Sequence, residues 1–98
     1  MEFEWDDTKA ASNERKHGVS FPEAATAFAD LLETIFPDPE HSDDEVREIL
    51  VGYPDRGRLL LVSFTERPPN LRIISARVAT PTERRNHEEN PMGGLGHE

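Results

Sequence analysis

The sequence predicts an α+β domain in which an antiparallel sheet carries two N-terminal helices on one face and ends in a C-terminal helix. Two apolar runs, 58–67 and 71–77, flank a Pro-Pro-Asn turn and are typical of a β-hairpin. Two capping boxes, Ser20-Phe-Pro-Glu23 and Thr80-Pro-Thr-Glu83, mark the starts of helices. The expected order of elements is β-α-α-β-β-β-β-α.

The first strand and helix are predicted over residues 2–5 and 8–17. Acidic and aromatic residues alternate in 2–5, which places Phe3 and Trp5 on one buried face. Asp6 or Asp7 supplies the N-cap of the helix, and Gly18 ends it in the left-handed conformation. Three polar side chains recur at helical spacing and predict a solvent-exposed face, whereas three others are expected toward the sheet. The exposed set is Lys9, Asn13 and Lys16, and the packed set is Ala10, Ala11 and His17.

The second helix, expected over 21–29, has a regular apolar stripe that predicts core residues: Phe21, Ala24, Ala25, Phe28 and Leu31 or Leu32. Short strands are then predicted at 33–36 and 46–53, and the acidic, turn-rich segment 38–45 between them is interpreted as an exposed loop. Carboxylates and His41 in that loop are metal-ligand types, but the loop lacks the glycine and alternation of a calcium loop, and no metal site is predicted. The remaining predicted elements are a turn at 54–57, the two hairpin strands, and a polar last helix at 80–89 that is either exposed or covered by a partner.

Length and composition limit the class of protein. With 98 residues the chain makes one domain, expected over 1–90 and followed by a flexible glycine-rich tail at 91–98. Cysteine is absent, which excludes disulfides and thiolate metal sites and fits a cytoplasmic protein. No signal peptide is visible, and the longest wholly apolar run is far too short to span a bilayer. No cofactor is expected.

The charge is distributed unevenly along the chain. The net charge of −9 argues at first against a nucleic-acid partner. Residues 56–85, however, contain seven arginines and two acids, a net +5, whereas the rest of the chain carries −14. This asymmetry predicts a local anion-binding face on an acidic body. Arginines that merely solvate one edge of the sheet are the alternative.

Strand parity separates the arginines of the hairpin. In a regular strand Arg72 shares a face with Ile74 and Ala76, whereas Arg77 shares the other face with Leu71 and Ser75. Only one of the two arginines is then expected to face a ligand. We favour Arg77, because it closes the apolar run and can emerge at a strand end, and we expect Arg72 to form a structural ion pair.

Several segments together resemble the BrnT toxin family over about residues 3–89. The opening Phe3-Glu-Trp-Asp6, the segment Lys16-His-Gly-Val-Ser-Phe21 and the alanine-rich second helix carry the resemblance. It continues in Thr65-Glu-Arg67, in Arg72-Ile-Ile-Ser-Ala-Arg77 and in Glu83-Arg-Arg85. Members of this family usually have a tyrosine at the position of His87.

The resemblance implies a RelE-like fold and a ribonuclease toxin of a type II toxin–antitoxin system. It also implies a BrnA-type antitoxin partner, with DNA contacted only indirectly through that antitoxin. No membrane association is expected, and a homodimer and a heterotetramer with the antitoxin both stay open.

Cleavage of RNA without a metal uses the 2′-hydroxyl as nucleophile and needs proton transfer together with phosphate stabilisation. Arginine binds phosphate bidentately and stays charged. A first set of residues is therefore expected to be catalytic, a second to bind RNA, and a third to be possible acids or bases. These sets are Glu66, Arg67, Arg77 and Lys16; Arg72, Arg84, Arg85 and Lys9; and His87 and His17.

Three alternatives stay open. Glu66 is either a general base, or a residue that orients one, or the salt-bridge partner of Arg67 or Arg77. His17 is expected to be mainly structural. His87 is expected to be exposed without a catalytic role, and a general acid is the alternative. A non-catalytic RNA- or protein-binding module on the same fold is the rival to the enzyme.

Overall fold

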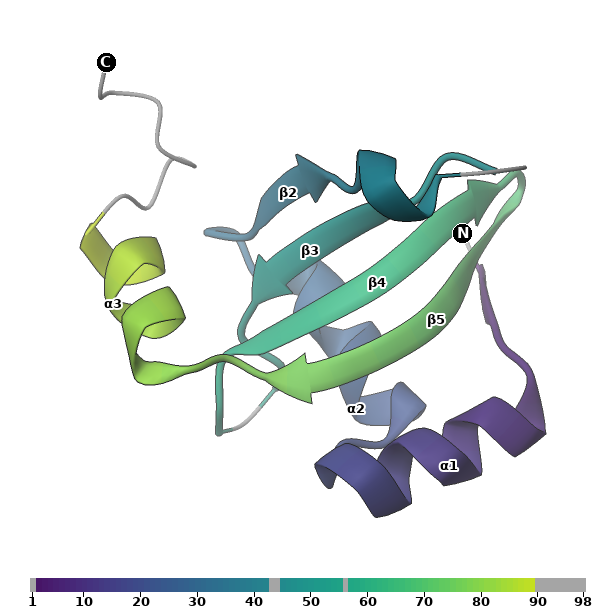
Figure 1. Cartoon of the computed structure of the whole chain (residues 1–98), viewed down its shortest axis with the longest axis horizontal. Helices are drawn as coiled ribbons and strands as arrows, with labels where there is room; N and C mark the ends of the chain where they lie inside the picture. The colour runs from purple at the N-terminus through teal and green to yellow at the C-terminus, as the bar shows by residue number, and fades with distance from the viewer. Residues whose placement is uncertain (1, 43–44, 56, 90–98) are drawn as a thin grey trace.

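The computed structural model describes residues 2–42, 45–55 and 57–89. A five-stranded sheet in the order β1-β5-β4-β3-β2 is backed by helices on one face (Figure 1). The predicted tail at 91–98 lies outside the described residues. The expected α+β class is confirmed, but the expectation of a purely antiparallel sheet is wrong, because β1 pairs with β5 in parallel. The chain runs from β1 directly into α1. In the sheet, β1 lies beside β5, the last strand, rather than beside β2, the next strand in the sequence.

The first half of the chain forms β1 (Glu2–Glu4), α1 (Asp7–His17) and α2 (Phe21–Thr26), followed by the 3₁₀ turn η1 (Ala27–Ala29). Asp6 caps α1 by accepting from the Lys9 amide, and Gly18 ends the helix at φ 69°. Ser20 caps α2 through the Glu23 amide, as the capping box predicts. The second helix ends at Thr26 rather than at the expected residue 29, and the chain continues as the tighter 3₁₀ turn η1.

The second half forms β2 (Thr34–Pro37), the 3₁₀ turn η2 (Pro39–His41), β3 (Glu48–Gly52), β4 (Leu60–Arg67), β5 (Asn70–Val78) and α3 (Pro81–Glu89). The segment expected as an exposed loop contains η2, where the His41 ring bonds to Asp38 at 3.0 Å. Strand β3 is shorter at both ends than expected, and β4 begins two residues later. In Figure 1, α2 lies behind the sheet, α1 lies along the β5 side and α3 stands beyond the end of β5.

The core lies between the sheet and the two N-terminal helices. Its largest fully buried side chains include Phe21 of α2, Leu50 of β3 and Phe64 of β4. Phe28 links this core to β1, since its ring lies 5.2 Å from Phe3 and 5.1 Å from Phe64. The two N-terminal helices thus cover one face of the sheet, called the helix side below, and among the described residues no α-helix covers the other face, called the outer face.

Candidate functional site

A β-bulge in β5 decides which arginines share a face. Ser63 pairs with Ser75 and Phe64 pairs with Ile73, so Ile74 is an extra residue in β5. Beyond the bulge, the side chains of β5 that point to a given face are therefore shifted by one residue. Thr65 pairs with Arg72, and Leu61 pairs with Arg77. Thr65 and Leu61 alternate along β4 with core residues, so both point to the outer face. The parity expectation that separated the two arginines is therefore wrong: Arg72 and Arg77 lie on the same outer face.

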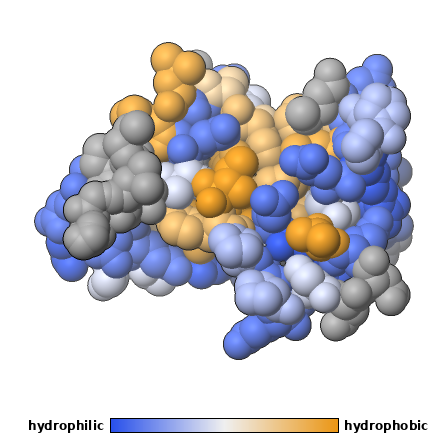
Figure 2. Space-filling model, turned by 90° about the horizontal axis from the view of Figure 1, so that it is seen from above, coloured by the Kyte–Doolittle hydropathy of each residue, from blue (hydrophilic) through white to orange (hydrophobic). Residues whose placement is uncertain are grey.

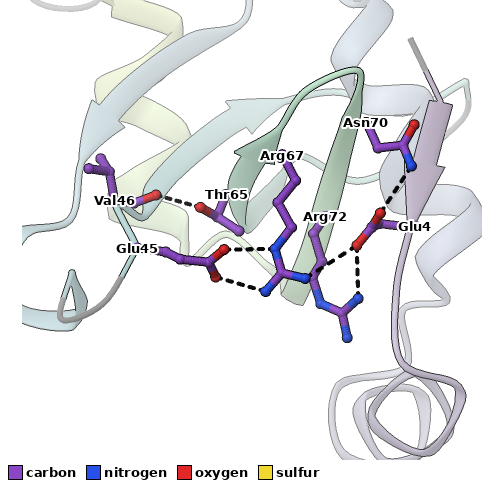
Figure 3. A network of polar contacts seen from close by, with 7 residues as sticks. All are labelled: Glu4, Glu45, Val46, Thr65, Arg67, Asn70 and Arg72. Carbon is purple, nitrogen blue, oxygen red and sulfur yellow. Dashed lines mark hydrogen bonds and ion pairs between the residues drawn. The ribbon is translucent and has the colours of Figure 1, made fainter.

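A polar network holds the arginines at the hairpin end of this face (Figure 3). The Arg67 guanidinium donates to both carboxylate oxygens of Glu45, at 2.7 and 2.9 Å. Glu4 of β1 accepts from Arg72 at 2.9 Å and from the Asn70 amide at 3.0 Å, and it lies 3.5 Å from Arg67. Arg72 thus has the structural ion pair expected for it, and Arg67 shares that pair's carboxylate.

The two carboxylates of this network stay ionised to lower pH than usual. The pKa of Glu4 is lowered by the hydrogen bond from Asn70 and then by the one from Arg72. The pKa of Glu45 is lowered by its hydrogen bond to Arg67. An anionic ligand that binds these arginines must therefore compete with carboxylates that hold their charge at neutral pH.

Arg77 is bound to the first turn of α3. Its guanidinium donates to both oxygens of Glu83, each at 2.9 Å, and these bonds lower the pKa of Glu83 to about 2. Glu83 also accepts from the Thr80 amide while the Thr80 hydroxyl accepts from the Glu83 amide, which completes the predicted capping box. The side chain of Arg77 is still 42 % exposed, so a phosphate can approach it from the outer face.

The last helix brings further polar groups to this end of the sheet. His87 is 9 % exposed, so the expectation of an exposed His87 is wrong. Its ring lies 6.3 Å from that of Tyr53, which follows β3. The Tyr53 hydroxyl donates to Glu88 at 2.6 Å, and this bond raises the tyrosine pKa, which keeps the phenol protonated.

A cleft of about 430 Å³ lies beside these groups, lined among others by Tyr53, Glu88, Arg58 and Arg84. Arg85 of the same helix is exposed. The cleft therefore combines two guanidinium groups with a phenol, next to the strand that carries Arg77.

Helix α1 approaches the sheet through the face that was expected to be exposed. Asn13 is 7 % exposed; its amide donates to the carbonyls of Val19 and Ala76, and its oxygen accepts from the Ala76 amide. Asn13 thereby supplies hydrogen bonds to the backbone of β5 at a point where β1 no longer pairs with that strand. Lys9 and Lys16 share this helical face with Asn13, and both are exposed. Ala10 packs on the core as expected, whereas Ala11 and His17 are exposed.

Glu66 lies apart from the arginines. It pairs with Leu71, whose side chain is 3 % exposed in the core, so Glu66 points to the helix side. There it lines a groove with Phe28 and Phe64. The structure therefore brings Glu66 neither to Arg67 nor to Arg77, either as a base or as a salt-bridge partner.

Sequence reasoning missed the contacts of four residues that join the elements around the arginines: Glu4, Asn13, Tyr53 and Glu83 as the partner of Arg77. Tyr53 is the one tyrosine of the chain and ends an apolar strand, which was an available signal. The pairing of Glu4 with β5 had none, because it depends on the parallel placement of β1. Across residues 2–42, 45–55 and 57–89 we find no group of three or more metal-ligating side chains and no helix suited to crossing a membrane.

Comparison with known proteins identifies relatives of this arrangement. A family model described as ribonuclease toxin, BrnT, of type II toxin-antitoxin system matches residues 5–83. The fold is similar to the crystal structure of the Brucella abortus ribonuclease toxin BrnT, with a TM-score of 0.65 and 28 % identity over 82 % of this chain and 97 % of that one. A search of curated protein sequences gave no match.

Proposed function

Since this chain belongs to the BrnT family of ribonuclease toxins of type II toxin–antitoxin systems, we propose that it cleaves RNA on the outer face of its sheet by a metal-independent mechanism. One observation carries the proposal. The bulge in β5 aligns Arg77 with Arg72 on a face that no helix covers, and α3 brings His87 and Arg84 to the end where Arg77 lies. Cleavage of RNA needs cations that bind its phosphates and a side chain that transfers a proton.

The chemistry follows from the groups at this end. The 2′-hydroxyl of the RNA gives its proton to water and attacks the adjacent phosphorus. The bond to the 5′ oxygen breaks, that oxygen takes a proton from His87, and a 2′,3′-cyclic phosphate forms. Arg77 stabilises the charge that develops on the phosphate oxygens, because its fork can leave Glu83 for a more highly charged partner. Its exposure and position at the end of β5 give the phosphate access.

Proton transfer is assigned to His87. The ring lies beside Tyr53, whose hydrogen-bonded phenol borders the cleft, and imidazole is the side chain that enzymes use most often for proton transfer. Neighbouring phosphates are bound by Arg72 and Arg67 along the face, by Arg84 and Arg85 on α3, and by Lys9 and Lys16 along α1. Glu66 takes no part in this step, since it lies on the helix side.

The partner and setting follow from the family. A toxin of a type II system implies a protein antitoxin, and we propose a BrnA-type antitoxin that binds DNA and so gives this chain only an indirect contact with it. We further propose that the chain acts in the cytoplasm, where its RNA substrate is found, and slows translation and growth.

The test is cleavage of a single-stranded RNA in excess EDTA. Wild-type protein is expected to cleave it, and Arg77→Ala is expected to lower the rate about 100-fold or more, as for removal of one charge-stabilising donor. Arg72→Ala is expected to weaken RNA binding with a smaller effect on the single-turnover rate. Arg15→Ala, an exposed cation on α1, is the matched control and is expected to change neither.

A binding module would behave differently in the same assay. If wild-type protein binds the RNA but leaves it intact, and Arg77→Ala changes only the affinity, the enzymatic proposal is refuted. Loss of wild-type cleavage in EDTA with recovery in Mg²⁺ would refute the metal-independent step.

A further inference from the structure

The helix side contains a groove that the proposed RNA site does not use. It has a volume of about 360 Å³ and its lining includes Phe3, Phe28, Ile35 and Leu71 together with Glu33 and Glu66. Its walls come from β1, α2, η1, β2 and the hairpin. Figure 2 looks down on the molecule from the side on which β2 lies in Figure 1. That view shows hydrophobic residues gathered across the middle of a hollowed surface, with more hydrophilic residues to either side.

The chain leading into and along β2 exposes further large apolar residues besides those of the groove. Leu31 is 96 % exposed, Leu32 55 %, Ile35 45 % and Phe36 43 %. Four large apolar residues exposed within six positions are unusual for a free surface, because scattered single residues are the norm. Strand β2 is also the last strand of the sheet on that side, so its outer backbone edge has no neighbouring strand among the described residues. Both features favour a protein partner.

The charge of the groove narrows the choice of partner. Glu33 and Glu66 are its charged lining residues, and no cation accompanies them. One oxygen of Glu33 is buried without a hydrogen-bond partner among the described residues. Burial and then the charge of Asp30 raise the pKa of Glu33, which a nearby cation would oppose. The groove therefore suits an apolar segment that carries a positive charge.

We propose that this groove is the docking site of the antitoxin, and that the docking segment places apolar side chains in it beside a lysine or arginine. The inference rests on the proposed function for the existence of that partner. RNA is disfavoured because both charged lining groups are acidic. A second copy of this chain is disfavoured because a two-fold interface would bring the same carboxylates together.

The experiment is titration calorimetry of the full chain with the product of the gene adjacent to its own, tested as the antitoxin. Ile35→Asp places a charge on the groove wall and is expected to weaken binding about 10- to 100-fold, as for an interface anchor. Leu31→Asp, at a side chain that is almost fully exposed and so carries little folding cost, is expected to weaken it severalfold. Val46→Asp is the control, since Val46 is 71 % exposed and its carbonyl accepts from Thr65 on the outer face.

Salt and charge give a second measurement. The wild-type affinity is expected to fall as NaCl rises, and Glu33→Gln is expected to reduce that dependence. RNA cleavage by Ile35→Asp and Leu31→Asp at the wild-type rate is expected and would show that the loss of binding is local.

Each outcome bears on one claim. Equal affinity of wild type, Ile35→Asp and Leu31→Asp would overturn the groove assignment and leave the proposed function standing. Failure of wild type to bind the neighbouring protein would overturn the antitoxin partnership itself, whether or not RNA is cleaved. A dimer of the free chain that Ile35→Asp dissociates would show that a second copy occupies the groove.

Discussion

The amide of Asn13 joins α1 to β5, and its removal should destabilise the fold strongly. Asn13→Ala takes away two donated hydrogen bonds, to Val19 and Ala76, and one accepted from the Ala76 amide. On the edge of β5 that faces away from β4, no strand of the described residues pairs at this position, because the pairing with β1 ends at Arg72. The three backbone groups would lose their partner at a buried position, since Asn13 itself is only 7 % exposed.

The magnitude follows from the number of groups left without a partner. A buried polar group that loses its hydrogen bond costs ~1–3 kcal/mol. Water can reach part of an open strand edge, so we expect a total near the lower end, about 3 kcal/mol for the three groups. For a domain of this size that corresponds to a fall in Tm of roughly 12 to 24 °C.

Urea unfolding followed by circular dichroism measures this loss, with Ser12→Ala, the exposed neighbour on α1, as control. Asn13→Asp should also be strongly destabilised, since a carboxylate can accept from the Ala76 amide but cannot donate to either carbonyl. Native-state hydrogen exchange should show faster exchange of the Ala76 amide in Asn13→Ala. A loss below about 0.5 kcal/mol, the range of ordinary surface changes, would refute the role assigned to Asn13.

Three further predictions test other contacts. Glu83→Gln should destabilise the fold by about 1 kcal/mol at pH 7, a value reduced for the exposure of the Arg77 pair. Because the pKa of Glu83 is about 2 in the folded protein and 4.5 is its ordinary value, the stabilisation is present above about pH 4.5 and is lost as pH falls toward 2. A difference in urea midpoint between the two proteins that stays constant from pH 7 to pH 3 would argue against this ion pair, and Glu40→Gln serves as the control. Gly18→Ala should cost about 1 kcal/mol in thermal unfolding, since φ is 69° there and no atom blocks the added methyl group; an unchanged Tm would show that the left-handed cap is not needed. Tyr53→Phe removes the hydroxyl that donates to Glu88 and should change stability by about 1 kcal/mol or less; a larger loss would mean that the bond holds α3 in place, which α3 amide exchange would reveal.

Local signals in the sequence were sufficient to predict most of the elements. The caps of α1, α2 and α3, the hairpin and most of the core stripe of α2 follow from short-range rules, and the structure confirms them. The end of that stripe, Leu31 or Leu32, was expected in the core, and this is wrong, because the two residues are 96 % and 55 % exposed. The face of α1 was predicted wrongly because Asn13 is polar, and a polar residue on a helix is ordinarily exposed. Here it is buried because it supplies the hydrogen bonds that β5 lacks from a neighbouring strand.

The arrangement of the candidate site depended on long-range geometry. The single extra residue Ile74 reverses the parity of β5, and alternation alone gives no sign of it. The parallel pairing of β1 brings Glu4 to Arg72, and the direction of α3 buries His87 beside Tyr53. The residue types needed for phosphate binding could thus be predicted, whereas their grouping on one face could not.

The central claim is that this chain cleaves RNA through the 2′-hydroxyl without a metal. The most direct measurement is single-turnover cleavage, in EDTA, of an RNA and of the same strand with one 2′-deoxynucleotide at the cleaved position. We expect the RNA to be cut to a product ending in a 2′,3′-cyclic phosphate and the substituted strand to stay intact at that position. Equal cleavage of the two strands, or cleavage of the RNA that disappears in EDTA, would contradict the claim.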